Sequence, residues 1–244
     1  RYKYLFRNMP MNTTTLFSCF AAFLKLYCIP KVLLPLYGDY LWPGAPNKQV
    51  RVAVLCENLT WTAKAWMVLT NPAIYPGVLG PNANVTFSAL VDPLNPGALP
   101  GVLTGVINSK ARLMIHIFSA PIGVALIKTW ATMGVQALPV GINVMAQLQT
   151  HWASTTGGCE YECILDTSGT RTPIVPGKTE LWWDKFVATY GAWPLYTAWG
   201  AYDSLYALKD ALERAGAAAL SYITDPGPPP YGTSAPLVPF FETT

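Results

Sequence analysis

The sequence predicts an α/β fold in which a doubly wound parallel sheet is flanked by helices on both faces. Short apolar segments alternate with amphipathic segments along most of the chain, and loops rich in proline and glycine separate them. This alternation is typical of parallel strands joined by crossover helices. The strand segments are apolar without a polar face, as expected for a sheet covered on both sides. The chain is 52% hydrophobic and only 12% charged, which argues against disorder.

The N-terminal region predicts a short strand at residues 4–7 and then a buried helix from Thr13 to about Tyr27, with Asn12 or Thr13 as its cap. The helix lies in an apolar stretch, Leu16 to Leu36. A membrane span needs roughly 20 uninterrupted apolar residues. This stretch is interrupted by Lys25, Pro30, Lys31 and Pro35. We therefore expect a buried amphipathic helix and no transmembrane segment.

Strands and helices then alternate from residue 51 to residue 190. The strands are expected at residues 51–56, 85–91, 112–118, 139–144 and 161–165. The helices are expected at residues 60–69, 99–108, 119–134, 146–153 and 179–190. Thr60 is expected to cap the first of these helices. Ser119 and Pro121 begin the third by a hydroxyl cap and a proline in the first turn, and Gly134 ends it. Residues 35–49 and 71–82 are expected to be loops.

The last predicted helix begins at Tyr196 and ends at Gly216, after a break marked by Gly191 and Pro194. Its apolar stripe, which we expect to be buried, consists of Leu205, Leu208, Leu212 and Ala215. Opposite charges four residues apart support its other face, in the pairs Lys209–Glu213 and Asp210–Arg214. Residues 225–239 are rich in proline, and we expect an extended tail there.

The five cysteines leave the disulfide pattern open. Cys19 and Cys28 on one helix would be about 13 Å apart along its axis, too far for a bridge. Cys159 and Cys163 are close enough in sequence to close a small loop, and the alternative is that the cysteines are small buried apolar residues. Asn-x-Thr triplets are compatible with an extracellular chain, although they also arise by chance; they begin at Asn12, Asn58 and Asn84.

The candidate binding site lies where the predicted strands end. Ligands of open parallel sheets bind beyond the carboxyl ends of the strands, where the N–H groups that begin the next helices are free. Such an edge suits a carboxylate or another polar group, and aromatic side chains would pack the apolar part of a ligand. The residues at these ends are Glu57, Trp61, Phe118, Ser119, Ala120 and Asn143, with Phe6, Arg7 and Asn8 at the end of the first strand.

Each candidate also has a purely structural interpretation. Trp61 and Phe118 are more typical of the hydrophobic core than of a ligand platform. Ser119 is equally compatible with a helix cap, and Asn143 is compatible with the closure of a turn. A core or hinge role, as opposed to ligand contact, is the preferred interpretation of Tyr196, Trp199 and Tyr202.

The sequence does not contain the standard enzyme motifs that we considered. The run Gly177-Lys178-Thr179 ends like a phosphate loop, but Thr172 stands where that loop needs a glycine. A Gly-x-Ser-x-Gly elbow is absent from the sequence. The two histidines are His116, inside an apolar strand and expected to be a satisfied core residue, and His151. We therefore expect neither catalysis nor a cofactor.

Metal and nucleic-acid binding are also not expected. A zinc site built from His151, Cys159 and Cys163 would match no standard ligand spacing. The net charge is +3 and the basic residues are scattered, so there is no concentrated basic surface for a nucleic acid.

Three stretches resemble a known family in their order and spacing. They are YKYLFRNMPMN at residues 2–12, ARLMIHIFSAPIGVALIKTWATMGV at residues 111–135 and WPLYTAWGAYDSLYALKDALERAG at residues 193–216. They resemble the first interlobe crossing, a mid-lobe strand and helix, and the helix after the second crossing of type I periplasmic-binding-protein folds. Within these folds the similarity is to ABC-transporter solute receptors of the branched-chain amino acid and amide group. It covers most of residues 2–216.

The resemblance implies that residues 1–190 form the C-terminal ligand-binding lobe. Residues 191–244 would contain a hinge crossing, the start of the return into the other lobe and the proline-rich tail. Against the family pattern, the first half of the N-terminal lobe, a signal peptide and the final crossing are missing, so we expect a fragment, a processed product or an incompletely observed chain that lacks its N-terminal lobe. The resemblance places the hinge at Phe6, Arg7, Asn8, Tyr196 and Trp199.

The function that the resemblance implies is that of an extracytoplasmic solute-binding protein of an ABC importer. Such a receptor closes by a hinge around a small polar ligand, such as an amino acid or amide, and presents it to a membrane permease. The expected location is extracellular or periplasmic, with a membrane anchor in the full-length protein. Two alternatives remain open: a sensing or surface-assembly module of the same fold without transport, and an α/β enzyme.

Carried over by position, the family's ligand contacts fall on Trp61, Ser119, Ala120 and Asn143. The branched-chain amino acid receptors place an acidic residue near the position of Asn143 to hold the ligand amine. Asn143 is neutral, which argues against an α-amino acid as ligand, and Glu57 is the remaining acidic candidate for that role.

Overall fold

A computed structural model describes residues 13–40, 47–165, 171–172 and 177–216 of the chain. It divides the chain into two compact units. The larger is Met11–Ser168, and the smaller joins Arg1–Pro10 to Gly169–Thr244. The smaller unit therefore includes the helix that the sequence analysis assigned to the end of the lobe. The predicted first strand and the predicted hinge residues Phe6, Arg7 and Asn8 lie outside the described residues.

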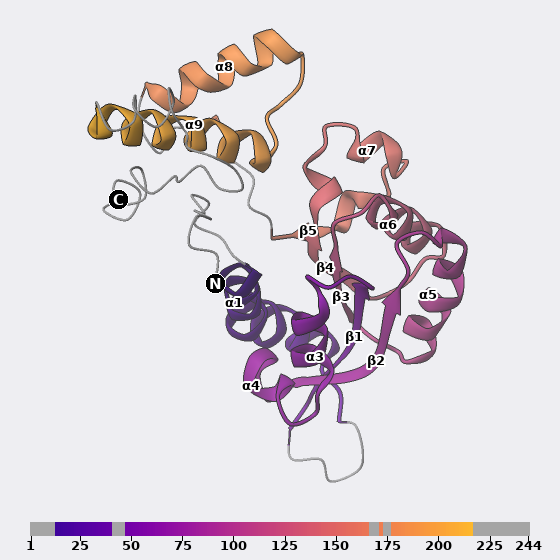
Figure 1. The fold of residues 1–244 in the computed structure, drawn as a ribbon. Coiled ribbons are helices and arrows are strands. Elements are labelled where there is room, and N and C mark those ends of the chain that lie inside the picture. Colours follow the sequence, from indigo (N-terminus) through magenta and orange to yellow (C-terminus); the bar gives the residue numbers. More distant parts are fainter. Residues whose placement is uncertain (1–12, 41–46, 166–170, 173–176, 217–244) are drawn as a thin grey trace, which may run out of the picture. The chain divides into compact units, whose positions relative to one another are not determined.

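The larger unit is built on a five-stranded sheet in the order β2-β1-β3-β4-β5 (Figure 1). The strands are β1 Val50–Glu57, β2 Ala83–Val91, β3 Leu113–Phe118, β4 Leu138–Asn143 and β5 Cys163–Ile164. All four neighbouring pairs are parallel. The chain adds β2 on one side of β1 and then β3, β4 and β5 on the other. The structure thus confirms the predicted α/β fold with a doubly wound parallel sheet.

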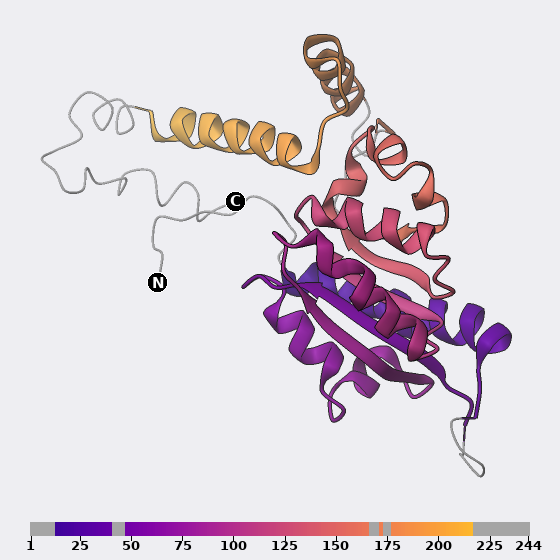
Figure 2. The ribbon, with the colours of Figure 1, turned by 90° about the vertical axis from the view of Figure 1, so that its right-hand side faces the viewer.

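Helices cover both faces of this sheet (Figures 1 and 2). One face carries α1 Thr13–Phe23, α3 Ala63–Thr70 and α4 Tyr75–Leu79, and the other carries α5 Leu99–Asn108 and α6 Ile122–Thr132. Val52 and Val54 of β1 belong to the first core, whereas Ala53 and Leu55 belong to the second. Successive side chains of a strand point to opposite faces, so a strand buried on both sides must be apolar throughout.

The N-terminal helical segment is longer than the sequence analysis expected. Helix α1 continues into a π-helical segment, η1 Leu24–Leu33, and then into α2 Leu34–Tyr37. Pro30 lies inside η1. Proline removes an N–H and crowds the preceding turn, and widening to the π pattern is one way for a helix to continue past it. Phe20, Leu24 and Leu33 of this segment are buried in the first core.

The same segment has the length and composition of a membrane-spanning helix. Thr15–Tyr37 is a run of 23 helical residues whose most apolar window has a mean hydropathy of 1.6, and it is the one candidate span within the described residues. The expectation that the helix ends near Tyr27 was wrong, because the chain stays helical through the lysines and prolines to Tyr37. Lys25 lies on its surface and donates a hydrogen bond to the carbonyl of Gly77 at 2.9 Å.

Three predicted elements differ in detail. The expected loop at residues 71–82 contains α4, with Pro76 in its first turn, where the missing N–H costs nothing. The expected helix at residues 146–153 is divided into a 3-10 turn, η3 Val144–Gln147, and a single helical turn, α7 His151–Ser154. The last strand is much shorter than residues 161–165, because the 3-10 turn η4 Gly158–Tyr161 occupies its expected start. A further 3-10 turn, η2 Pro96–Ala98, leads into α5.

The described part of the smaller unit contains α8 Lys178–Tyr190 and α9 Tyr196–Ala215. Aromatic rings join the two helices, and the ring centroids of Trp182 and Trp199 are 4.1 Å apart. Leu205 and Leu208 are 67% and 40% exposed, so the predicted buried stripe on α9 was wrong at both positions. The reason is that α9 turns the face of Trp199 and Tyr202 towards α8 instead.

The polar face and the end of α9 are as predicted. Both predicted ion pairs form at the surface, with N–O distances of 2.6 Å for Lys209–Glu213 and 2.9 Å for Asp210–Arg214. Gly216 follows the helix with a φ of +53°, a conformation that a residue with a side chain adopts only at a cost.

Candidate functional site

The candidate site follows from the strand order. The connection from β1 runs to β2 on one side of β1, and the next connection runs from β2 back to β3 on the other side, so the topological switch point lies between β1 and β3. In open α/β sheets the loops at the carboxyl ends of such strands diverge and leave a crevice for ligands. Here these ends are Glu57 of β1 and Phe118 of β3, on directly paired strands.

A buried carboxylate joins the two loops at the switch point. Glu57 is 0% exposed and accepts four hydrogen bonds. Its Oε1 accepts from the Trp61 indole Nε1–H at 2.8 Å, from the Ser119 backbone N–H at 2.9 Å and from the Ser119 hydroxyl. Its Oε2 accepts from the Ala120 backbone N–H at 3.0 Å. We call Trp61, Ser119 and Ala120 the donor cradle.

This arrangement changes what the donors do. Ser119 and Ala120 were expected to leave their N–H groups free for a ligand, but both donate to Glu57. The Ser119 hydroxyl does not cap α6, because it too donates to that carboxylate. The negative charge lies just before the first turn of α6, where the helix dipole favours an anion. The sequence pattern had identified an anion-binding edge, and a side chain of the same protein fills it.

The loop after β1 is fixed by a second buried group. Thr62 is 0% exposed, and its hydroxyl donates to the backbone carbonyl of Glu57 at 2.6 Å. Thr60 was expected to cap the following helix, but α3 begins at Ala63 directly after Thr62. The Thr62 hydrogen bond folds the chain back at the end of β1 and so brings Trp61 over the carboxylate.

The predicted ligand-binding residues fall into two groups. Trp61, Ser119 and Ala120 are partly exposed beside one another at the switch point. Glu57, Phe118 and Asn143 are 0% exposed. Phe118 lies in the second core with α5 and α6, and Asn143 ends β4. The structure thus brings Glu57 and the donor cradle together, and ligand contact at these positions stays a prediction.

A second buried carboxylate was not anticipated from the sequence. The side chain of Glu162, which precedes β5, is 1% exposed. Its Oε1 lies 3.0 Å from His116 Nε2 and accepts from the Asn143 amide at 2.8 Å. Its Oε2 lies 2.8 Å from His151 Nε2. Burial alone raises the pKa of the Glu162 carboxyl, but the hydrogen bonds and charge of His116 and the bonds of Asn143 and His151 bring it below its ordinary value.

The two histidines and two of the cysteines lie near this Glu162 cluster in the sequence or in the structure. His116 is a core residue, as predicted, since it is 0% exposed, but only its Nε2 is satisfied, by Glu162, and its buried Nδ1 has no hydrogen-bond partner. His151 also contacts Glu162, and within the described ranges no group of three or more His, Cys, Asp or Glu has a geometry that could hold a metal ion. Cys159 and Cys163 are both free thiols, so the loop-closing disulfide considered from their spacing is not formed.

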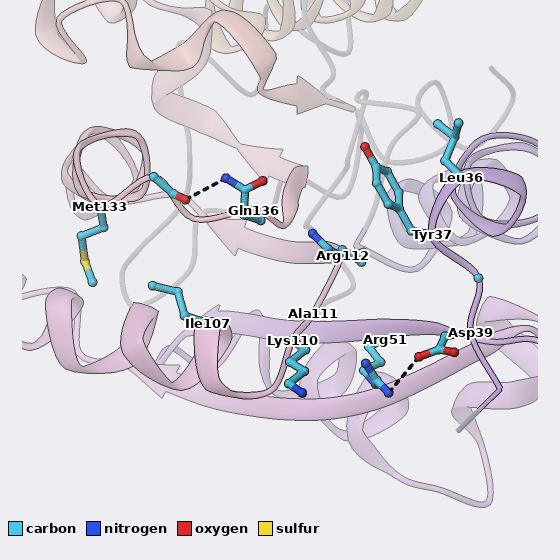
Figure 3. A pocket seen from close by; sticks show the side chains of 12 residues that line it. Leu36, Tyr37, Asp39, Arg51, Ile107, Lys110, Ala111, Arg112, Met133 and Gln136 are labelled. Atoms are coloured by element: carbon cyan, nitrogen blue, oxygen red, sulfur yellow. Dashed lines mark hydrogen bonds and ion pairs between the residues drawn. The ribbon is translucent and has the colours of Figure 1, made fainter. Parts of the chain in front are cut away.

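A cavity of about 600 Å³ lies at the opposite edge of the sheet, near the amino ends of β1 and β3 (Figure 3). Its wall carries three cations, of which Arg51 donates to Asp39 at 3.2 Å and Arg112 lies over the Tyr37 ring at 5.3 Å. The third is Lys110. The C-terminal ends of α5 and α6 reach this edge, and their carbonyl groups favour cations there without any ligand. The cavity is therefore not where the strand order places a ligand.

The strand order and its switch point are those of an open, doubly wound parallel α/β sheet. No family model matches the sequence. No curated protein matches it either. Among solved structures, the chain is similar to a solute binding protein of an ABC transporter from R. palustris, solved in complex with benzoate. The TM-score is 0.55 at 11% sequence identity, over 82% of this chain. The chain spans about half of that protein, 47% of its length, and the likeness shows the fold.

Proposed function

We propose that this chain contributes one lobe of a solute-binding protein that serves an ABC importer. The observation that carries the proposal is the switch point between β1 and β3, where the partly exposed Trp61, Ser119 and Ala120 are held in place by a buried carboxylate. A rim of this kind, fixed by the scaffold on rigid strand ends, is what a binding site for a small molecule requires. The similarity to an ABC transporter solute binding protein supports the same assignment.

The mechanism in this proposal is hinge closure around a small polar ligand. A second lobe, for which the neighbour's additional length leaves room, would close over the rim and exclude water from the ligand. The closed form would then be presented to a membrane permease. The residues that we assign to ligand contact are Trp61, Ser119 and Ala120, and Tyr196 and Trp199 are the assigned hinge residues. Such a receptor works outside the cytoplasm, in the periplasm or at the cell surface, and performs no catalysis.

Tryptophan fluorescence tests the proposal with the protein as it is. The panel contains amino acids, amides, sugars and aromatic acids, with the Trp61→Phe variant measured beside the parent. A bound ligand at the switch point changes the emission of the parent, and this change is lost in Trp61→Phe. Trp152→Phe is the matched control, because Trp152 is 57% exposed on α7 and is not among the residues that bond to Glu57. A ligand whose signal survives Trp61→Phe but is lost in Trp152→Phe would contradict the assigned site.

A further inference from the structure

The donor cradle is fully used within the protein. Glu57 accepts four hydrogen bonds, three at Oε1 from the Trp61 indole, the Ser119 N–H and the Ser119 hydroxyl, and one at Oε2 from the Ala120 N–H. None of the three N–H donors has a second hydrogen to offer. Because Glu57 is 0% exposed, water does not compete for its oxygens. The Trp61 indole N–H and the Ser119 and Ala120 N–H groups are therefore not free to hold a ligand carboxylate.

An incoming carboxylate would meet a second obstacle at the same place. It would lie beside the negative charge of Glu57, and the donors of the cradle are already bonded to Glu57. Burying a second negative charge there without new hydrogen-bond donors is unfavourable. The Ser119 hydroxyl oxygen keeps acceptor capacity, and the ring of the partly exposed Trp61 offers an electron-rich face. What remains accessible thus favours a hydrogen-bond donor or a cation over an anion.

We propose that Glu57 determines ligand specificity: its carboxylate occupies the donor cradle in place of a ligand carboxylate, so the ligand meets this rim with a neutral or cationic group. The inference rests on the proposed function for the existence of a ligand. The structural part of the inference, that the donor cradle is a carboxylate-binding site filled by the protein's own Glu57, does not depend on the proposed function.

Removing the side chain of Glu57 tests the structural half. Glu57→Ala deletes the equivalent of one acetate ion and leaves the four donors around a closed cavity. Acetate at about 100 mM is expected to raise the unfolding temperature of Glu57→Ala by about 3 to 5 °C, as for a site with a dissociation constant near 10 mM. Formate is expected to act more weakly, and chloride and benzoate not at all, because benzoate does not fit the volume of the missing side chain.

Two controls make the result specific. Glu57→Gln keeps the cavity filled and turns an amide N–H towards a donor, so it lowers the unfolding temperature without any rescue by acetate. Glu160→Ala removes an exposed carboxylate of the same unit and responds to no anion. If Glu57→Ala does not fold in chloride, acetate must restore its folded circular dichroism spectrum on refolding. Equal effects of acetate on Glu57→Ala and Glu57→Gln, or no effect on either, would overturn the inference.

The specificity half is tested on the parent protein with the same ligand panel. Among ligands matched in size, neutral amides and cationic amines are expected to bind the parent at least tenfold more tightly than the corresponding carboxylates. Glu57→Ala is expected to reduce this ratio of affinities. Preference of the parent for carboxylates would overturn the specificity role even if acetate rescues Glu57→Ala. If the parent binds no member of the panel while rescue occurs, the proposed function fails and the internal carboxylate site stands.

Discussion

Replacing Glu162 by glutamine should destabilise the larger unit strongly, although the two side chains have nearly the same shape. The carboxylate accepts hydrogen bonds from His116, His151 and Asn143 while its side chain is 1% exposed. A glutamine has one acceptor oxygen and one amide group that donates. In Glu162→Gln the new amide group faces one of these three donors, and the two donors do not bond to each other. The other hydrogen bonds become weaker because their acceptor is no longer charged.

The size of the effect follows from these three bonds. Hydrogen bonds to a charged group contribute about 1.5 to 3 kcal/mol each, and neutral ones about 0.5 to 1.5 kcal/mol. The loss over three bonds, one of them replaced by a donor–donor contact, is about 3 kcal/mol in the free energy of unfolding. For a domain of this size it corresponds to a fall of about 6 to 12 °C in the unfolding temperature.

The assay is thermal and urea unfolding followed by circular dichroism, at a series of pH values. The pKa of Glu162 is lower in the folded protein than its ordinary value of 4.5, so its contribution to stability is complete above that value. It is lost as the pH falls through the lower, folded pKa. The difference between the parent and Glu162→Gln should therefore be full at pH 7, begin to shrink below about pH 4.5 and vanish in stronger acid.

The matched control is Glu160→Gln, two residues away on the exposed surface of η4. It should leave the unfolding temperature at pH 7 unchanged within about 1 °C, since exposed charges contribute little. An unfolding free energy of Glu162→Gln within about 0.5 kcal/mol of the parent at pH 7 would show that the Glu162 cluster does not stabilise the fold. A difference that grows steadily into strong acid would contradict the direction of the pKa shift.

Two further predictions concern packing and thiol reactivity. A methyl group on Gly141 would overlap the backbone carbonyl of His116 on the neighbouring strand, so Gly141→Ala should lower the unfolding temperature by more than 5 °C. The control is Gly101→Ala on α5, where the methyl group has open space and should raise the unfolding temperature slightly. Burial raises the pKa of the Cys56 thiol to about 12, whereas Cys19 is exposed. A disulfide reagent at pH 8 should label Cys19 at least a hundredfold faster than Cys56, as peptide mass spectrometry would measure, and equal rates would contradict the buried position.

Much of the fold is predictable from the sequence because its determinants are local. The run from Val52 to Cys56 is apolar and contains two β-branched valines, and Pro121 and Gly134 mark the ends of α6. Such signals predicted a parallel sheet covered on both faces. Local patterns failed on α9, where the partner of the helix decided which face is buried: aromatic contacts with α8 left Leu205 and Leu208 exposed.

The candidate site was predictable only in part, because its decisive contacts connect distant positions. Ser119 and Trp61 were identified from strand ends, but the partner that both share is Glu57, which is 62 residues from Ser119. Glu162 was missed for the same reason, since it is 46 residues from His116 and belongs to no local motif. An acidic residue beside a short strand gives no signal by itself. A buried histidine without a local partner was the signal that a distant carboxylate was needed.

Chemical-shift mapping by nuclear magnetic resonance would test where this protein binds a solute. The nitrogen-15 spectrum of the parent is recorded during titration with the tightest ligand of the fluorescence panel. We expect the largest shifts at the Trp61 indole and at the Ser119 and Ala120 amides, at the carboxyl ends of β1 and β3. Shifts concentrated instead around Lys110 and Arg112, in the cavity at the amino ends of the strands, would contradict the assignment of the site.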